Sequence, residues 1–295
     1  GYSACLDLTN PGAKEWLMDK LHLLQTKYGV DGFKLDAGDP YFYNNKNLVS
    51  YKKVSPNDQC TEWAKIGLAF PFNEYRAMWK MGGEPLVERL ADKSHTWGDL
   101  QTLIPNTLAQ QLLGYTFTCP DMIGGGNFIS FLPGSKIDQK LIVRSAQVHA
   151  LMPMMQFSVA PWRILDSIHL QAVNKAVKIR QHNVPYLMAV MRQAAETGEP
   201  AVRTLSYNYP GSGYESITDQ FMMGDDMLVA PVVTENDGRM VVLPPGDWYY
   251  QNKKWKGGKT YNINVALDEL PVFIKKRGTA VWKSQIKKDK PHPYL

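Results

Sequence analysis

The sequence predicts an α/β protein, with a partial (β/α)8 barrel over residues 1–225 and a small antiparallel β domain over residues 226–295. Three observations support this prediction. Helical patterns alternate with short apolar segments in the first part, and some of these segments end in a carboxylate. After about residue 225 the chain changes to short β runs separated by Gly and Pro.

The first helix, strand and loop set the pattern. Residues Pro11–Tyr28 predict an amphipathic helix, because apolar residues recur near helical spacing, Pro11 suits a first turn and Gly29 suits a stop. A short apolar segment, Gly32–Asp36, follows and ends in a carboxylate. Helix, short strand and carboxylate-led loop form the repeating unit of an α/β barrel, whose chemistry lies at the carboxyl ends of its strands.

The same alternation continues along the chain. We expect helices at Trp97–Leu113, Asp138–Leu151, Ile168–Asn183 and Pro185–Thr197, with strand-like segments at Gly114–Thr118 and Met154–Ser158. About five strand candidates precede residue 210, too few to close an eight-stranded barrel, so the barrel is expected to be truncated. The later β runs are Met227–Val232, Met240–Tyr250 and Leu270–Ile274.

Composition narrows the function classes. The 295 residues are 44% hydrophobic and 21% charged, which suits a soluble globular protein and argues against disorder. The net charge of +5 is modest and no nucleic-acid-reading motif accompanies it, so we expect no nucleic-acid partner. No Cys/His cluster has metal-ligand spacing and no phosphate-cradling loop is present, so neither a metal nor a cofactor is expected.

Asp36 is the first candidate for chemistry, because a carboxylate at the end of a buried strand is costly unless it is solvated or partnered. A loop-starting Asp that caps the next turn is an equally good interpretation of its position. Lys34 lies two residues earlier and therefore on the same strand face, where a cation would stabilise an ionised carboxylate. Structural ion pairs give the same pattern.

A catalytic carboxylate often works with a second one; in retaining glycoside hydrolysis, for example, the two carboxyl groups lie about 5–5.5 Å apart. The segment before the second long helix offers Asp92 and Asp99. Asp92 ends another apolar stretch and so mirrors the placement of Asp36, whereas Asp99 falls inside the helix, where a solvated position is more natural.

Several motifs, in order and in register, resemble one enzyme family. They are Asp31–Asp39 (Asp-Gly-Phe-Lys-Leu-Asp-Ala-Gly-Asp), Arg76, Asp121 with Gly124 and Gly125, Arg144 with Gln147, Gly198–Leu205, Gly224–Val232, Leu243–Trp248 and Leu270–Phe273. Together they resemble glycoside hydrolase family 31 over nearly the whole chain. The resemblance implies a C-terminal part of a retaining α-glycosidase that needs no cofactor, since two carboxylates suffice.

The resemblance also implies roles for individual residues. Asp36 corresponds to the catalytic nucleophile, and Lys34, Arg76 and Asp121 to residues that hold the sugar. In the family the acid/base lies five residues before an aromatic that opens a helix, here Trp97, so Asp92 carries that role and Asp99 does not.

Two further positions are assigned to substrate binding in the same way. Trp97 is the aromatic just mentioned, and Ser158 stands where the family commonly has a histidine after the Arg-x-x-Gln helix. The usual Trp-x-Gly-Asp around the acid/base is replaced by Arg-Leu-Ala-Asp at residues 89–92. These two departures from the family pattern, at Ser158 and at residues 89–92, resemble a branch of the family. That branch has α-galactosidase specificity and an endoplasmic-reticulum form anchored in the membrane.

The expected substrate is therefore an oligosaccharide or glycoconjugate with a terminal α-galactoside, hydrolysed in the secretory pathway. An α-glucosidase or α-xylosidase is the alternative within the family, and a non-catalytic carbohydrate-binding or chaperone-like homologue is the alternative outside it. We expect any membrane anchor to lie only in a part of the protein that precedes Gly1. The isolated chain is expected to be inactive, because the family's first barrel strands would also precede Gly1.

Overall fold

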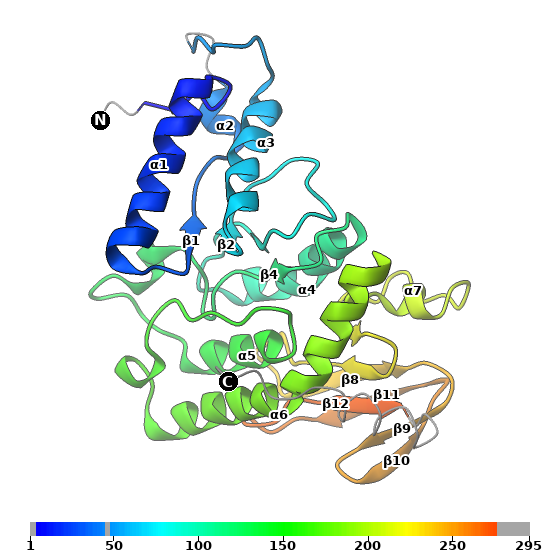
Figure 1. The fold of residues 1–295 in the computed structure, drawn as a ribbon. Helices are drawn as coiled ribbons and strands as arrows, with labels where there is room; N and C mark the ends of the chain where they lie inside the picture. The colour runs from blue at the N-terminus through cyan, green and yellow to red at the C-terminus, as the bar shows by residue number, and fades with distance from the viewer. Residues whose placement is uncertain (1–3, 45–47, 276–295) are drawn as a thin grey trace. The chain divides into compact units, whose positions relative to one another are not determined.

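The computed structural model of the chain describes residues 4–44 and 48–275 (Figure 1). The chain forms two compact units. The N-terminal unit is Gly1–Ala91 and the C-terminal unit is Asp92–Leu295.

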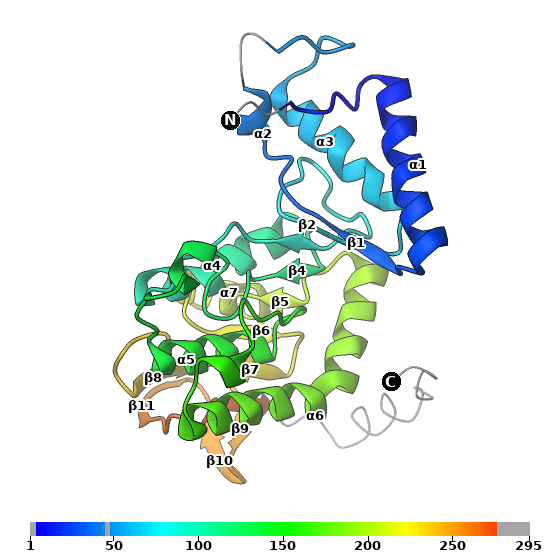
Figure 2. The same ribbon diagram turned by 90° about the vertical axis from the view of Figure 1, so that its left-hand side faces the viewer.

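The N-terminal unit contains a small parallel sheet next to two helices. Its strands β1, β2 and β3 pair in that order, and both pairings are parallel. Figures 1 and 2 show α1 and α3 running alongside this sheet. The elements are α1 (Pro11–Tyr28), β1 (Gly32–Leu35), α2 (Pro40–Tyr43), α3 (Pro56–Ile66), the 3-10 helix η1 (Gly67–Ala69), β2 (Phe72–Tyr75) and β3 (Glu88–Arg89).

Local sequence explains how these elements begin and end. The side chain of Asn10 caps α1 by accepting from the amides of Gly12 and Ala13, and Gly29 ends the helix in the left-handed region, with φ of 65°. The predicted helix Pro11–Tyr28 is thus confirmed. Gly32 sits so close to β2 that an added Cβ would lie 1.9 Å from the carbonyl oxygen of Phe72, so only glycine fits there.

The helices of the C-terminal unit are α4 (Trp97–Leu112), α5 (Gln139–Ala150), α6 (Ser167–Thr197) and the short α7 (Leu205–Asn208), with 3-10 helices η2 (Phe128–Phe131) and η3 (Pro161–Arg163). The two helices predicted at Ile168–Asn183 and Pro185–Thr197 are in fact one helix, α6, with Pro185 inside it. Figures 1 and 2 show that α6 bends, which a proline inside a helix explains by removing a hydrogen bond.

Two predicted strand segments of this unit differ from the structure. The extended residues near 114–118 are reduced to the short strand β4 (Thr118–Cys119). Met154–Ser158 forms no strand, and its strand-like contact is a single bridge between Ile123 and Phe157. Short apolar segments of this kind do not determine by periodicity whether they form strands.

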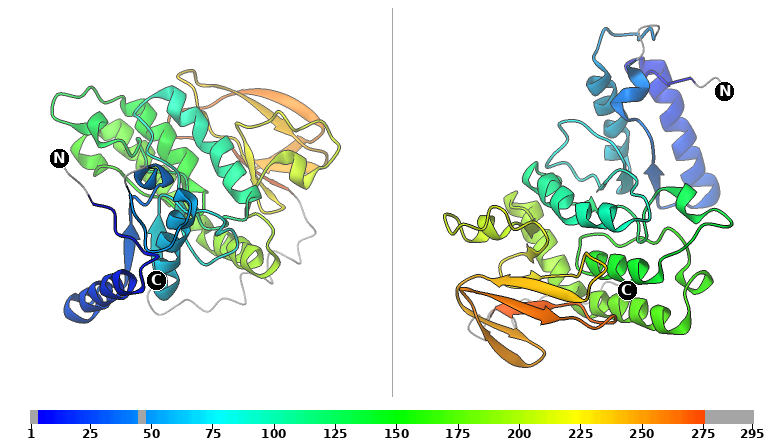
Figure 3. Two further views of the ribbon diagram at one scale, coloured as in Figure 1. Left: turned by 90° about the horizontal axis from the view of Figure 1, so that it is seen from above. Right: turned by 180° about the vertical axis from the view of Figure 1, so that it is seen from behind.

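The C-terminal strands form two antiparallel sheets around one core. A six-stranded sheet has the order β10-β9-β12-β7-β6-β5, and β8 pairs with β11. Figure 3 shows these yellow and orange strands grouped together. The strands are β5 (Val202–Arg203), β6 (Phe221–Met223), β7 (Met227–Val229), β8 (Gly238–Leu243), β9 (Asp247–Tyr250), β10 (Lys253–Lys256), β11 (Lys259–Asn264) and β12 (Val272–Lys275).

Their shared core contains Met222, Leu228, Val241, Trp248 and Phe273, all fully buried. The expected β-rich C-terminal part is therefore confirmed. The six-stranded sheet also includes β5 and β6, which precede residue 225, so the predicted boundary between residues 225 and 226 falls within a sheet. None of the helices described here combines the length and the apolar character needed to cross a bilayer.

Candidate active site

In the N-terminal unit, Asp36 directly follows β1, and the chain turns sharply after it. Ala37 and Gly38 both have positive φ, 61° and 80°. A left-handed alanine is strained by roughly 1–2 kcal/mol, and strain of this kind concentrates at functional sites. A Cβ on Gly38 would lie 2.1 Å from Cδ1 of Trp63, so the turn packs tightly on α3. The turn leaves the Asp36 side chain 55% exposed.

Two arginines lie beside the Asp36 carboxylate, and both approach the same oxygen. Nη2 of Arg89 donates to Oδ1 at 3.2 Å, and Nε of Arg76 is 3.8 Å from Oδ1. Arg89 is nearly inaccessible, with 2% of its side chain exposed, and Arg76 is 16% exposed. All contacts of this carboxylate with described residues fall on Oδ1.

A network of alternating charges surrounds this contact. Nζ of Lys34 is 3.1 Å from Oε1 of Glu74, and Nε of Arg89 is 3.4 Å from the same oxygen. Lys34 and Glu74 are register partners across β1 and β2. Arg76 in turn donates through Nη2 to Asp39 at 2.7 Å. The sequence pattern suggested Lys34 as the cation beside Asp36, but arginines hold that place and Lys34 pairs with Glu74.

Next to Asp36, the N-terminal unit has a cavity of about 270 Å³. Its wall is mostly apolar and includes Ala37, Phe42, Tyr43 and Trp63. The indole Nε1 of Trp63 is buried and has no hydrogen-bond partner among the described residues. An aromatic wall beside a carboxylate suits a sugar, which offers an apolar ring face and hydroxyl groups.

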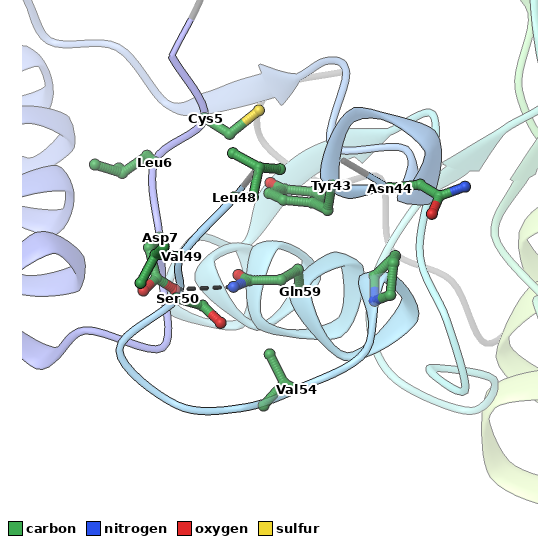
Figure 4. Close-up of a pocket in the computed structure, with 11 residues that line it drawn as sticks. Cys5, Leu6, Asp7, Tyr43, Asn44, Leu48, Val49, Ser50, Val54 and Gln59 are labelled. Atoms are coloured by element: carbon green, nitrogen blue, oxygen red, sulfur yellow. Dashed lines mark hydrogen bonds between the residues drawn. The ribbon is translucent and has the colours of Figure 1, made fainter. Parts of the chain in front are cut away.

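A second cavity of about 350 Å³ in the same unit shares Cys5, Leu6 and Tyr43 with the first (Figure 4). Figure 4 shows Asp7 joined to Gln59, whose Nε2 donates to Oδ1 of Asp7 at 2.9 Å. Burial acts to raise the pKa of Asp7, but hydrogen bonds from Gln59, Tyr51 and Thr9 outweigh it and hold that pKa below its usual value. The Asp7 carboxylate is thus occupied in tying the segments of the unit together.

Glu88 is a strongly perturbed carboxyl group of the N-terminal unit. It lies on β3 next to Arg89, and burial raises the pKa of its side chain to about 8. Its Oε2 is buried without a hydrogen-bond partner among the described residues. The group is therefore mainly neutral at pH 7.

In the C-terminal unit, Asp121 is fully buried and orders a glycine loop. Its Oδ2 accepts hydrogen bonds from the amide of Lys93 at 2.7 Å and from the amide of Gly126 at 2.8 Å. Asp121 itself has φ of 75°, a left-handed conformation that aspartate adopts more readily than most residues. The hydroxyl of Ser158 donates to the carbonyl oxygen of Gly125, so Ser158 supports the same loop.

Asp92 lies beside this loop and is exposed. A Cβ added to Gly126 would come within 3.0 Å of Oδ1 of Asp92 and within 2.4 Å of Oδ1 of Asp121. Gly126 therefore lies next to both carboxylates, and a larger residue there would have to displace the side chain of Asp121. The C-terminal unit thus brings Asp92, Asp121 and Ser158 to one place.

Trp97 begins α4, and its indole Nε1 donates to Oδ2 of Asp138 at 2.9 Å. Asp138 also caps α5 by accepting from the amide of Leu141. Asp99, the rejected alternative for the acid/base, accepts a hydrogen bond from the amide of Ser94 and so stabilises the entry to α4. Its role in the structure is local.

His149 on α5 lies behind the loop. Its Nε2 is 3.3 Å from the carbonyl oxygen of Asp121, and its Nδ1 is 2.7 Å from that of Ser145. Burial lowers the pKa of His149 to about 4, although these carbonyl groups act in the opposite direction. The imidazole is therefore neutral at pH 7.

Arg144 and Gln147, the pair that matches the Arg-x-x-Gln motif, have a structural role. Arg144 is fully buried, donates to Oδ1 of Asp237 at 2.9 Å and to the carbonyl of Val265 at 3.0 Å, and Gln147 donates to the carbonyl of Leu267. Both side chains thus fasten α5 to the segments around β8 and β11. Within the described residues, no group of three or more His, Cys, Asp or Glu side chains has the arrangement of a metal site.

The predicted site residues thus form two local groups. Lys34, Asp36 and Arg76 lie together in the N-terminal unit, and Asp92, Asp121 and Ser158 lie together in the C-terminal unit, with Trp97 nearby in the chain. That the Asp36 and Asp92 carboxyls face each other stays a prediction. The sequence reasoning missed Arg89 and Glu74. Arg89 could have been found from the sequence, because it replaces the tryptophan of the family's Trp-x-Gly-Asp motif.

Comparisons with known proteins agree with the sequence motifs. Residues 198–279 match the "Glycosyl hydrolase family 31 C-terminal domain". The chain is 33% identical to the myogenesis-regulating glycosidase of Mus musculus, covering 96% of the chain and 40% of that protein. It is 27% identical to alpha-glucosidase 2 of Bacillus thermoamyloliquefaciens, covering 99% of the chain and 40% of that protein. The chain spans less than half the length of either relative.

Solved structures show the same fold at lower identity. A GH31 family sulfoquinovosidase from E. rectale, in complex with an aza-sugar inhibitor, superposes with a TM-score of 0.82 at 22% identity, covering 96% of this chain and 45% of that one. A cycloalternan-degrading enzyme from Trueperella pyogenes, in complex with a covalent intermediate, superposes with a TM-score of 0.82 at 20% identity, covering 92% of this chain and 42% of that one.

Proposed function

Because the chain belongs to glycoside hydrolase family 31, we propose that its parent protein is a retaining α-glycosidase that removes terminal α-linked sugars. The observation that carries the proposal is Asp36, an exposed carboxylate on a strained turn after β1, held on one oxygen by arginines. Hydrolysis with retention of the anomeric configuration requires one carboxylate that attacks the anomeric carbon and a second one that acts as acid and then as base.

In the proposed mechanism, Asp36 attacks the anomeric carbon while Asp92 protonates the departing oxygen. Asp92 then takes a proton from the water that releases the sugar from Asp36. The exposure of both side chains suits groups that must reach a substrate. Arg76 and Lys34 would hold the sugar, and Asp121 with Ser158 would shape the loop beside Asp92.

We further propose that the parallel strands β1–β3 and the helices around them are part of a (β/α)8 barrel completed by residues outside this chain. The parallel pairing supports this, as does the coverage of less than half of the relatives' length. The isolated chain would then lack part of the sugar site and should be inactive. A secretory-pathway location for the parent protein follows only from the likeness to the branch described above.

For the substrate we propose an α-galactoside in an oligosaccharide or glycoconjugate. Ser158 supports it, because a hydroxyl that supports the Gly125 loop replaces the imidazole that the family commonly offers to the sugar. An α-glucoside is the second candidate, because relatives such as alpha-glucosidase 2 carry that name.

The test is nitrophenol release by the complete parent protein from α-galactoside and α-glucoside substrates. Asp36→Asn should lower kcat on the order of 10⁴-fold or more, as loss of a catalytic nucleophile does. Asp99→Asn is the matched control, since that carboxylate bonds the amide of Ser94, and it should retain activity. Glucoside cleavage alone would keep the mechanism and reject the galactoside, and activity that survives Asp36→Asn would reject the nucleophile.

A further inference from the structure

Arg89 is a buried arginine that bonds the proposed nucleophile from a position where the family motif has tryptophan. Its guanidinium is held on three sides. Nη1 donates to the carbonyl oxygen of Leu90 at 3.2 Å, Nε faces Oε1 of Glu74 at 3.4 Å, and Nη2 donates to Oδ1 of Asp36 at 3.2 Å. Only 2% of the side chain is exposed. A guanidinium fixed in this way cannot swing away from Asp36.

The structure assigns Arg89 as a positioning residue that holds Oδ1 of Asp36, leaves Oδ2 to attack the sugar, and speeds release of the sugar from the covalent intermediate. This inference rests on the proposed function. Arg76 is less suited to the same task, because its Nε is 3.8 Å from Oδ1 and its Nη2 is engaged by Asp39 at 2.7 Å.

The chemistry explains why the second step should respond more strongly. In the first step the Oδ2–C1 bond forms, and the bond from C1 to the leaving oxygen breaks with its electron pair on that oxygen, which takes the proton of Asp92. Asp36 is then an ester whose carbonyl oxygen is Oδ1. In the second step water attacks C1 and gives its proton to Asp92, and the C1–Oδ2 electron pair returns to the carboxylate.

The charge at Asp36 therefore disappears in the first step and returns in the second. A cation that donates to Oδ1 stabilises the carboxylate at both ends of the cycle. It slightly opposes attack, because the nucleophile loses charge, and it favours departure, because the leaving carboxylate regains charge. Removing the cation should consequently slow sugar release and let the ester accumulate.

The experiment uses the parent protein with its best nitrophenyl glycoside, whose good leaving group makes the first step fast. For Arg89→Gln we expect kcat to fall about 10- to 100-fold, the effect of one hydrogen bond to a charged group. KM should fall in parallel and kcat/KM should change much less, with a burst of nitrophenol equal to the enzyme concentration. Arg89→Lys, which keeps the charge, should recover part of kcat.

A matched control separates this role from a purely structural one. Arg239 is 6% exposed and bonds the Asp219 carboxylate and the main-chain oxygens of Asp219 and Ala230, so it is buried and partnered much as Arg89 is. Arg239→Gln should lower the melting temperature and the active fraction without changing KM. In Arg89→Ala, added guanidinium ion should restore kcat in a saturable way.

The outcomes are distinct. If Arg89→Gln lowers kcat with KM unchanged and gives no burst, or if Arg89→Lys and Arg89→Gln both behave as the wild type does, the inference is wrong. Should Arg89→Gln fail to fold, the KM-against-kcat split of Arg89→Lys decides the question alone. If instead the enzyme with Arg89 intact keeps its activity after Asp36→Asn, the proposed function fails and not merely the role of Arg89.

Discussion

The two units hold their central carboxylates in opposite ways. In the N-terminal unit, two arginine side chains approach Oδ1 of Asp36, whose side chain is 55% exposed. In the C-terminal unit, two main-chain amides donate to Oδ2 of Asp121, which is fully buried. Both carboxylates lie at left-handed turns, yet Asp36 is exposed and Asp121 is fully buried, so of the two only Asp36 can be reached by a substrate.

The difference separates two tasks of a charged side chain. Amides bonded to a buried carboxylate fix the path of the main chain, so Asp121 sets the shape of the 121–126 loop and the place of Gly126 beside Asp92. Arginines bonded to an exposed carboxylate fix the orientation of that carboxylate, whereas the path of the main chain there is set by other contacts. We infer that Asp121 acts mainly on stability and Asp36 mainly on chemistry.

The largest expected effect is the loss of stability caused by Asp121→Ala, and it tests the difference between the two carboxylates directly. The substitution leaves the amides of Lys93 and Gly126 without their carboxylate acceptor, and each lost charge-assisted hydrogen bond costs about 2 kcal/mol. We expect the free energy of unfolding of the C-terminal unit to fall by about 4 kcal/mol. Hydrogen exchange of the parent protein, followed separately in the two units, measures it.

Asp36→Ala is the matched counterpart and should cost less than about 1 kcal/mol, because the carboxylate is exposed and its arginines keep other partners. An Asp36→Ala variant destabilised as much as Asp121→Ala would show that the two carboxylates do the same structural work. The comparison would then be wrong.

Helix bounds and the first candidate residue of the site can be predicted from residues next to each other in the chain. Asp36 was a candidate because an apolar strand ends there, although only the family resemblance gave it the role of nucleophile. The cap and stop residues of α1 located the helix bounds. The choice of Asp92 over Asp99 used the family's spacing from Trp97 and stays a prediction, while the structure shows the amide of Ser94 donating to Asp99. Strand ends and helix caps are local patterns, which a sequence carries directly.

Contacts between strands could not be predicted in the same way. Lys34 pairs with Glu74 because β1 and β2 are in register, and Arg89 reaches Asp36 from β3, 53 residues later. Nothing in the spacing of charges along the chain specifies such partners. Likewise α6 continues through Pro185, because packing of α6 against α5 offsets the cost of one missing hydrogen bond.

The two units also differ in the sign of their expected response to pH, and Glu88 gives the larger effect. Burial raises its pKa to about 8 in the folded N-terminal unit, above the ordinary value of 4.5. Its stabilising contribution is therefore complete below pH 4.5 and is lost as the pH rises through 8. Between pH 5 and pH 8 the N-terminal unit should lose about 3 kcal/mol.

Glu88→Gln should remove most of that pH dependence, whereas Glu84→Gln, at an exposed position of the same unit, should leave it in place. Protection of the N-terminal unit against hydrogen exchange, measured at several pH values with correction for intrinsic rates, gives the result. A slope that is the same in both variants would mean that Glu88 is not the titrating group.

His149, in the C-terminal unit, gives the smaller of the two pH effects, and it has the opposite sign. Its folded-state pKa of about 4 lies below the ordinary value of 6.5, because burial disfavours the imidazolium. The contribution to stability is then complete above pH 6.5 and is lost as the pH falls towards 4. We expect about 2 kcal/mol of lost stability between pH 7.5 and pH 5.

His149→Gln should flatten this loss, since the glutamine amide can still donate to the carbonyl oxygen of Ser145 but does not titrate. His182→Gln, at an exposed position on α6, is the control and should leave the loss of stability unchanged. Protonation of His149 should also affect the candidate site, because Nε2 of His149 lies 3.3 Å from the carbonyl oxygen of Asp121. Acid should therefore loosen the Asp121 loop before it opens the N-terminal unit, and the reverse order in hydrogen exchange would contradict the assignment of these two groups to opposite pH responses.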